Sequence, residues 1–158
     1  MKYELNQDTY RKYLKEYNSN SDEFAILIDR DAKTHSEKNM LECIRHCKKN
    51  NYACYIANPL FEFWLLLHLS DVKEEYADRL EEIKENKKVS NNHTFVSREV
   101  SVKANHGKSG INFKKNYLPN FNIAIERAKK FASDEQELLD HIGCNIWKLL
   151  ELMREYKK

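Results

Sequence analysis

Apolar positions in this chain gather in short runs, and the first clear run covers residues 24–28. A short apolar run bounded by polar residues is typical of a strand buried on both faces, as in a parallel sheet covered by helices. The run ends at Asp29, Arg30 and Asp31. Because side chains alternate along an extended chain, Asp29 and Asp31 should point one way and Arg30 the other. The pattern therefore predicts two carboxylates that face one spot at the end of a buried strand.

A second strand is expected close to the first one. Residues 36–50 show helical apolar spacing, and the apolar run at 52–57 follows them. Strand, helix and strand in this order predict a right-handed crossover between parallel strands. Ligands of such sheets bind beyond the carboxyl ends of the strands. Asp29, Asp31 and Asn58 are therefore expected at one edge of the sheet.

The segment after this second strand predicts a buried helix, because residues 60–69 are apolar on nearly every side. Asn58 suits its N-cap and Pro59 its first position. Glu62 is unusual there, since a carboxylate in apolar surroundings is costly unless it is paired, hydrogen-bonded or bound to a metal. A helix terminus or an arginine could equally satisfy it. His68 on the same helix is more typical of a hydrogen-bonded core histidine than of a proton shuttle.

The rest of the chain predicts mainly helices. The expected elements are a helix with Tyr10, Leu14 and Tyr17, a charged helix over 72–86, an edge strand within 94–102, a helix with Phe121, Ala124, Ile125 and Ala128, and a last helix that starts at a Ser133/Gln136 capping box. Residues 87–117 are expected to form a basic loop. The predicted fold class is α/β, with a small, mostly parallel sheet flanked by helices and a helical C-terminal extension over 118–158.

Length and composition favour one domain. The 158 residues, 41% of them hydrophobic, are enough for a single packed core over 1–158. The net charge of +2 neither demands nor excludes nucleic acid as a partner. The start of the chain lacks a signal-type apolar core, and the longest apolar run, 59–69, is too short to cross a bilayer. We therefore expect a soluble, cytoplasmic protein without a membrane partner.

The cysteines favour a structural interpretation. Cys43 and Cys47 share one face of the expected helix with Met40 and Ile44, which is a core pattern. Adding His46 and Cys54 gives a conceivable metal cluster, but the spacing matches no common zinc template. Reduced, buried thiols are the preferred interpretation.

The acidic residues carry the strongest chemical hypothesis. An Asp-x-Asp pair after a strand is a weak signal alone, because acids often end strands, and Asp31 or Thr34 could simply cap the next helix. Glu62, which should reach the same edge, strengthens it. Asp29, Asp31 and Glu62 are the predicted metal ligands and catalytic residues. Three carboxylates suit Mg²⁺ or Mn²⁺, which hold phosphate oxygens and activate water for phosphodiester cleavage.

Cations and amides near this edge and in the expected loop could bind the substrate. The candidate substrate-binding residues are Arg30, Asn58, Lys103, Lys108 and Lys115. A solvated lysine-rich loop is the simpler alternative. Gly107-Lys108-Ser109 superficially matches the end of a P-loop, but Val102 occupies the position of the first glycine and no buried strand precedes it. A P-loop nucleotide hydrolase is therefore excluded.

Two stretches of the chain together resemble a known family. Residues 26–31 and the Asn-Pro-x-Phe-Glu-x-Trp-x-Leu-x-His string at 58–68 resemble the RloB-like proteins, a bacterial defence-associated group related to Toprim domains. Lys114, Lys115 and Tyr117, followed by residues 124–129, look like that family's C-terminal part, so the resemblance covers residues 24–131. It implies a Toprim-like fold, a metal-dependent nuclease activity, and often an ATPase encoded alongside in phage-defence loci.

The chain departs from the Toprim pattern at one point. The resemblance implies an Asp-x-Asp pair, matched by Asp29 and Asp31, and a glutamate after an earlier strand in a Glu-Gly context. The polar start of this chain offers no such strand, and neither Glu4 nor Glu23 has that setting. Either the chain is an N-terminally shortened version, or Glu62 supplies the third acid, or the site is degenerate.

Three functional hypotheses follow. The leading one is a metal-dependent nuclease, acting on DNA or RNA in antiviral defence such as abortive infection. The second is a degenerate Toprim-like binding module or effector subunit held by a partner ATPase. A receiver-like acidic pocket is less favoured, because no additional acidic pair lies on an earlier strand. A shortened sheet would also expose an edge that a second copy could cover, which makes a homo-oligomer an open expectation.

Overall fold

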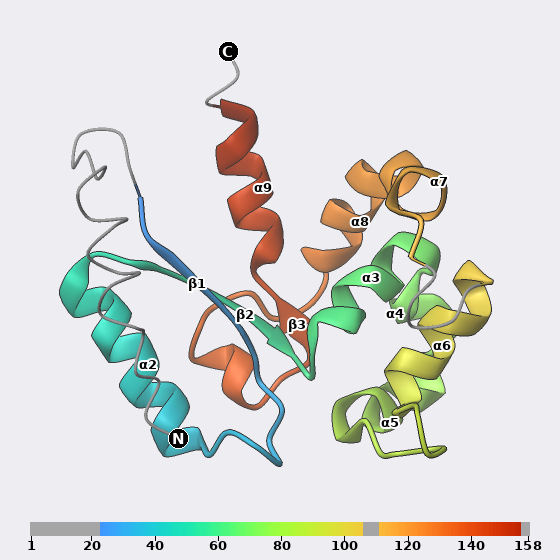
Figure 1. Cartoon of the computed structure of the whole chain (residues 1–158), viewed down its shortest axis with the longest axis horizontal. Coiled ribbons are helices and arrows are strands. Elements are labelled where there is room, and N and C mark those ends of the chain that lie inside the picture. Colours follow the sequence, from blue (N-terminus) through green and yellow to red (C-terminus); the bar gives the residue numbers. More distant parts are fainter. Residues whose placement is uncertain (1–22, 106–110, 156–158) are drawn as a thin grey trace.

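A three-stranded sheet separates two groups of helices in the computed structural model, which describes residues 23–105 and 111–155 (Figure 1). The elements are β1 (Ala25–Asp29), α2 (Glu37–Asn50), β2 (Ala53–Asn58), α3 (Phe61–Leu69), α4 (Val72–Glu75), η1 (Ala77–Arg79), α5 (Leu80–Glu85), α6 (Phe95–Ala104), α7 (Phe113–Asn116), η2 (Leu118–Asn120), α8 (Phe121–Ala128), η3 (Glu137–Leu139), β3 (Gly143–Cys144) and α9 (Ile146–Glu155). The expected helix around Tyr10, Leu14 and Tyr17 lies outside the described residues.

The sheet has the order β1-β2-β3. β1 and β2 are parallel, with the register running from Ala25 opposite Ala53 to Asp29 opposite Ala57, and β3 adds antiparallel to β2. The intervening helix α2 begins at Ser36, whose side chain accepts a hydrogen bond from Asn39 N at 3.2 Å. Ser36 rather than Asp31 or Thr34 therefore caps this helix. The predicted α/β class and the parallel strand pair are confirmed.

The two faces of the sheet belong to two hydrophobic clusters, because side chains alternate along β2. Cys54 and Ile56 face α2, whereas Tyr55 and Ala57 face α3 and its neighbours. The smaller cluster consists of Met40, Ile44, Cys47, Cys54, Ile56, Leu138 and Leu139. The larger cluster is built mainly from α3, α6, α8 and the start of α9. β2 is thus the strand that is buried on both faces.

β1 differs from the prediction. Ile26 and Ile28 are half-buried against the smaller cluster, but Leu27 is 54% exposed on the other face. The reason is that α3 and α9 pack against β2, and the described residues do not cover Leu27. The apolar run was therefore a correct sign of a strand, but the expected burial on both faces is wrong for β1.

The region around α6 corrects two further predictions. The expected charged helix over 72–86 is divided into α4, η1 and α5. Residues 94–102, expected to contain an edge strand, lie largely in α6, and Thr94 N donates to Ser97 Oγ at 3.0 Å at its start. Val96 and Val100 are both buried. Their spacing of four residues puts two β-branched side chains on one buried face of α6. Helical spacing therefore outweighs strand propensity in this segment.

The last helix begins later than the Ser133/Gln136 capping box predicted. β3 precedes α9, which starts at Ile146. Gly143 approaches the backbone so closely that a Cβ atom there would lie 2.1 Å from Ala132 O. The buried side chain of Asn145 then completes the edge of β2, since its Oδ1 accepts from Ile56 N at 2.6 Å and its Nδ2 donates to Cys54 O at 3.0 Å.

α3 is surrounded by the larger cluster, as its apolar sequence predicted. Its last carbonyls are bound by side chains near α8: Arg127 Nη1 donates to Leu67 O and Asn120 Nδ2 donates to His68 O. His68 is fully buried, its Nδ1 lies 2.9 Å from Trp64 O, and burial lowers the pKa of its imidazole. The core interpretation of His68 is confirmed.

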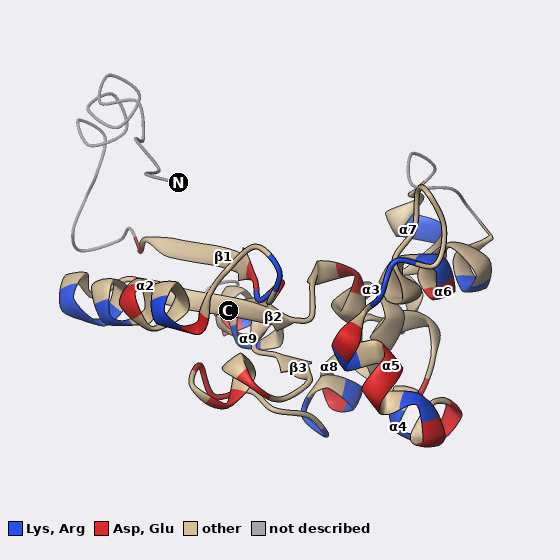
Figure 2. Cartoon of the chain, turned by 90° about the horizontal axis from the view of Figure 1, so that it is seen from below, with Lys and Arg blue, Asp and Glu red and all other residues tan. Residues whose placement is uncertain are grey.

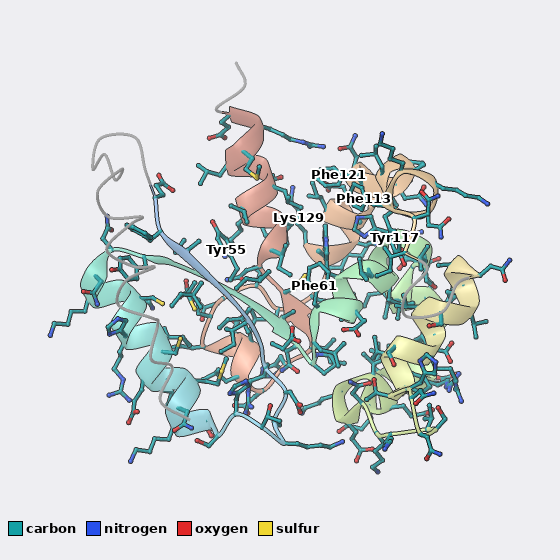
Figure 3. All side chains as sticks on the ribbon, in the orientation of Figure 1. Tyr55, Phe61, Phe113, Tyr117, Phe121 and Lys129 are labelled. Atoms are coloured by element: carbon teal, nitrogen blue, oxygen red, sulfur yellow. The ribbon has the colours of Figure 1, made fainter. Side chains whose placement is uncertain are left out.

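Aromatic side chains lie at both ends of α3 (Figure 3). Figure 3 shows Phe61 at the start of α3 and Tyr117 and Phe121 near its other end. The rings of His68 and Tyr117 meet edge-on at 5.7 Å between centroids.

Among the described residues, no helix is long and apolar enough to span a membrane.

Candidate functional site

Asp29 is the best-defined side chain at the acidic edge of the sheet. It ends β1, and its Oδ1 accepts a hydrogen bond from Phe61 N at 2.8 Å. Asp29 therefore supplies, from a neighbouring strand, the oxygen that an N-cap side chain usually supplies to a helix. The prediction that Asn58 caps α3 is wrong: Asn58 still belongs to β2, the Asn58–Pro59 peptide is cis, and the helix begins at Phe61.

Asp31 and Glu62 lie close to Asp29. Asp31 Oδ1 accepts from Lys33 N at 3.1 Å in the turn after β1. Glu62 is in the first turn of α3 and is half-buried, so it is not the deeply buried carboxylate that its apolar neighbours suggested. Partial burial raises the pKa of Asp29 above its usual 3.8; the Phe61 N–H opposes this shift, and the charges of Glu62 and Asp31 add to it. Glu62 and Asp31 thus lie near enough to Asp29 for their charges to act on it.

The three carboxylates do not form a compact ligand set. In the part of the chain that the structure describes, only the thiols of Cys43, Cys47 and Cys54 bring three potential metal-ligating atoms within 4.8 Å of one another. Mg²⁺ in proteins usually binds through one or two carboxylates and keeps several waters. The acidic edge fits that open mode of binding rather than a closed cage.

Arg30 and Asn58 connect the carboxyl ends of β1 and β2 to the segment around η3. Arg30 is 7% exposed; its Nε donates to Leu139 O and its Nη1 to His35 O, both at 2.9 Å. Asn58 Nδ2 donates to Leu138 O at 2.9 Å. Both side chains therefore have a clear structural task. Arg30 also lines the same cleft as Asp31, so the predicted separation of Arg30 from Asp31 is wrong, because β1 ends at Asp29.

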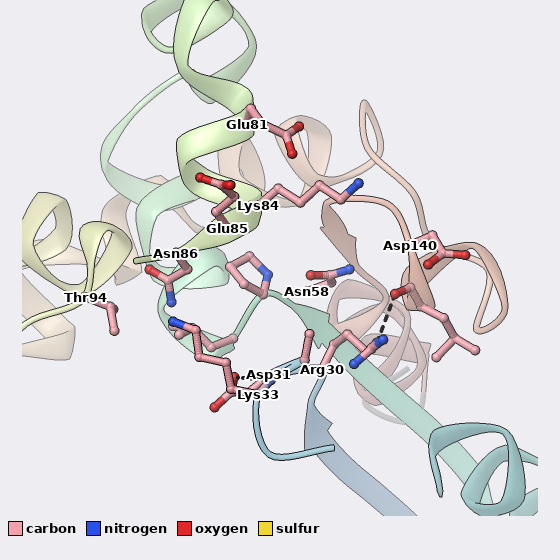
Figure 4. Close-up of a pocket in the computed structure, with 14 residues that line it drawn as sticks. Arg30, Asp31, Lys33, Asn58, Glu81, Lys84, Glu85, Asn86, Thr94 and Asp140 are labelled. Carbon is pink, nitrogen blue, oxygen red and sulfur yellow. Dashed lines mark hydrogen bonds between the residues drawn. The ribbon is translucent and has the colours of Figure 1, made fainter. Parts of the chain in front are cut away.

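A cleft of about 350 Å³ opens beside Asp31 and Asn58. Its walls come from the turn after β1, the start of the segment after β2, helix α5, the beginning of α6 and the residues after η3 (Figure 4). Lys33 extends into it from the β1 side and Lys84 from α5. The cleft also has acidic walls at Glu81, Glu85 and Asp140. Asp31 links the acidic edge to this mixed-charge cleft.

The predicted loop lysines lie elsewhere. Lys103 is on α6 and forms an ion pair with Glu75 at 2.6 Å, and Lys115 is on the short helix α7; neither lines the cleft. Lys108 falls outside the described residues. Figure 2 shows both signs of charge interspersed along α2, α4 and α6. The substrate-binding role of these lysines stays a prediction.

Sequence reasoning missed the two lysines that do line the cleft. Lys33 carries a usable signal, since it follows Asp31 by two residues at the end of a predicted strand. Lys84 carries none, because its place depends on how α5 packs with α6 and η1. Tertiary packing, not local pattern, brings it to Asp31 and Asn58.

Comparison with known proteins identifies the family. The model of the RloB-like protein family matches residues 4–153, which is nearly the whole chain. Neither the curated proteins nor the solved structures contain a match. The family match includes both the acidic edge and the string at 58–68 that connects β2 to α3. The chain belongs to the RloB-like protein family.

Proposed function

We propose that this chain is a divalent-metal-dependent nuclease that uses Mg²⁺ or Mn²⁺ at the acidic edge of its sheet. The observation that carries the proposal is the 2.8 Å hydrogen bond from Phe61 N to Asp29 Oδ1, which brings the first turn of α3, with Glu62, to the end of β1 just before Asp31. Carboxylates gathered at one edge attract a divalent cation, which would relieve their mutual repulsion.

Each residue at the edge has a distinct proposed role. Asp29 and Asp31 would hold the ion, and Glu62, from the first turn of α3, would orient it or complete its ligands. When bound, such an ion polarises a phosphodiester and activates a water molecule. Lys33 and Lys84, on two walls of the adjacent cleft, would hold the phosphate groups of a substrate strand. The general acid and base are not assigned.

Family membership supports the biological setting. RloB-like proteins resemble Toprim domains and are associated with bacterial defence, so we propose that the substrate is DNA or RNA and that cleavage serves defence against phages. An ATPase partner belongs to the same proposal. The family match alone supports this setting, whereas the acidic edge supports the chemistry.

A cleavage assay with charge-neutralising variants tests the nuclease. Asp29→Asn, Asp31→Asn and Glu62→Gln keep side-chain size, and Asn at position 29 keeps an oxygen for Phe61 N. Each is expected to lower Mg²⁺- or Mn²⁺-dependent cleavage of DNA and RNA substrates by at least about a hundredfold, since removing one charged partner of a transition state costs on the order of 3 kcal/mol. Asp78→Asn, which removes an exposed carboxylate on η1 that does not line the cleft, is the matched control and should retain activity. Full activity in the first three variants would overturn the assignment.

A second function has its own supporting observation. Asp29 caps α3, Asp31 closes a turn, and the carboxylates do not converge within a single coordination sphere. These features favour a Toprim-like binding module or effector subunit held by an ATPase. That function predicts a complex with the ATPase that survives Asp29→Asn and Asp31→Asn, together with no metal-dependent cleavage by the wild type.

A further inference from the structure

Three sulfur atoms converge on the opposite side of the sheet from α3. Cys43 and Cys47 are one turn apart on α2, and Cys54 on β2 faces them across the smaller cluster. Their Sγ atoms all lie within 4.8 Å of one another, and all three thiols are free. Cys54 is paired in register with Ile26, three residues before Asp29. The thiol cluster is therefore separate from the acidic edge.

The structure confirms free thiols packed in the smaller cluster and adds a proximity that the sequence spacing did not show. Their sequence spacing matches no zinc template because the third thiol comes from a different element, and only the packing of α2 on β2 brings it in. His46, considered with them from the sequence, is exposed, and its ring meets Tyr52 edge-on at 6.2 Å. It is not part of the cluster, so the described ligand atoms are sulfur only.

The three thiols also offer more than core volume. An apolar core needs only volume at these positions, which Ala or Val would also supply, whereas three thiols within 4.8 Å of one another form a ligand set for soft metal ions. A coordinated cation would stabilise the three thiolates that bind it.

The exposure of the thiol cluster to solvent also fits metal binding. Cys43 is half-buried whereas Cys47 and Cys54 are buried, so the cluster reaches the surface at Cys43. We propose that Cys43, Cys47 and Cys54 bind one soft, thiophilic metal ion, Zn²⁺ or Cu(I), through three thiolates. On binding, each Sγ–H releases its proton to solvent as an Sγ–metal bond forms. Zn²⁺ would add a solvent ligand to reach four-coordination, whereas Cu(I) accepts three sulfurs. The ion would connect α2 to β2.

The test is an anaerobic titration of the reduced, full-length chain. Zn²⁺ is added in competition with a chromophoric chelator, and Cu(I) is supplied in a separate arm as a complex with a competing ligand. We expect one ion per chain, release of about three protons per ion at neutral pH, and a raised melting temperature, because a ligand of the folded state stabilises it. Binding of one ion per chain together with the rise in melting temperature, rather than the tighter affinity, identifies the ion that the site accepts.

Cysteine variants locate the site. Cys43→Ala and Cys54→Ala are expected to weaken binding at least tenfold and to abolish the rise in melting temperature. The matched control is Cys144→Ala, which removes the remaining cysteine, buried in the other cluster. If Cys54→Ala fails to fold, as judged by circular dichroism, the half-buried Cys43→Ala decides alone. Absence of stoichiometric binding by the wild type, or equal binding by Cys43→Ala, would overturn the proposal.

Discussion

Asp29 combines a structural and a proposed chemical role, and two substitutions separate them. Asp29→Ala removes the oxygen that Phe61 N donates to, so the free energy of unfolding should fall by about 0.5–2 kcal/mol, the usual cost of losing a helix cap. Asp29→Asn keeps the oxygen and should stay near the wild-type stability. Urea denaturation of both variants measures the difference, with Asp140→Ala as an exposed acidic control. Equal stability of the Ala and Asn variants would contradict the capping role.

His68 makes the stability of the fold depend on pH. Burial lowers the pKa of its imidazole below the usual 6.5, so the unfolded chain takes up a proton at a higher pH than the folded chain does. The stabilisation contributed by neutral His68 is complete above 6.5 and is lost as the pH falls toward the folded-state pKa.

Replacing His68 by Phe should remove this dependence. We expect the wild type to lose stability between about pH 7 and pH 5 more steeply than His68→Phe. Chemical denaturation at a series of pH values gives both curves, and a substitution at exposed His141 serves as the control. Parallel curves for the wild type and His68→Phe would show that His68 does not titrate as proposed.

At the scale of elements, β3 depends on Gly143, because this residue lies directly against the backbone of Ala132. An added Cβ would meet Ala132 O at 2.1 Å, so Gly143→Ala must displace either β3 or the parallel bridge to Ala132. We expect a loss of at least about 1–3 kcal/mol in the free energy of unfolding, as for other overpacked positions. Thermal or urea unfolding measures it, with exposed Gln136→Ala as control. Unchanged stability in Gly143→Ala would refute the close approach.

Hydrophobic periodicity correctly predicted the helices and strands whose own residues show a clear apolar spacing. β1, α2, β2, α3 and α8 all lie within a residue or two of the expected ranges. The same signal failed where two patterns compete. Val96 and Val100 favour strands by propensity but lie on one face of α6. The last helix was expected to begin well before Ile146, but the segment before α9 contains β3, which is fixed by its pairing with β2 rather than by its own residues.

At the scale of the whole molecule, the sequence predicted the acidic edge and missed the cleft beside it. Asp29 and Asp31 follow from the rule that the ends of parallel strands meet at one edge, and the Phe61 N bond to Asp29 brings Glu62 there, whereas their role as metal ligands stays a prediction. The cleft beside them depends on α5 and the segment after η3, which no local pattern connects to β1. The meeting of Cys54 with Cys43 and Cys47 depends in the same way on the packing of α2 against β2.

Calorimetric titration of Mg²⁺ and Mn²⁺ into the full-length chain tests the central claim most directly. The wild type is expected to bind the ion, the double variant Asp29→Asn/Asp31→Asn to bind it at least tenfold more weakly, and Asp140→Asn to bind it as the wild type does. Circular dichroism checks that all three are folded. A folded wild type that binds neither ion, or a double variant that binds as well as the wild type, would contradict a metal site at the acidic edge.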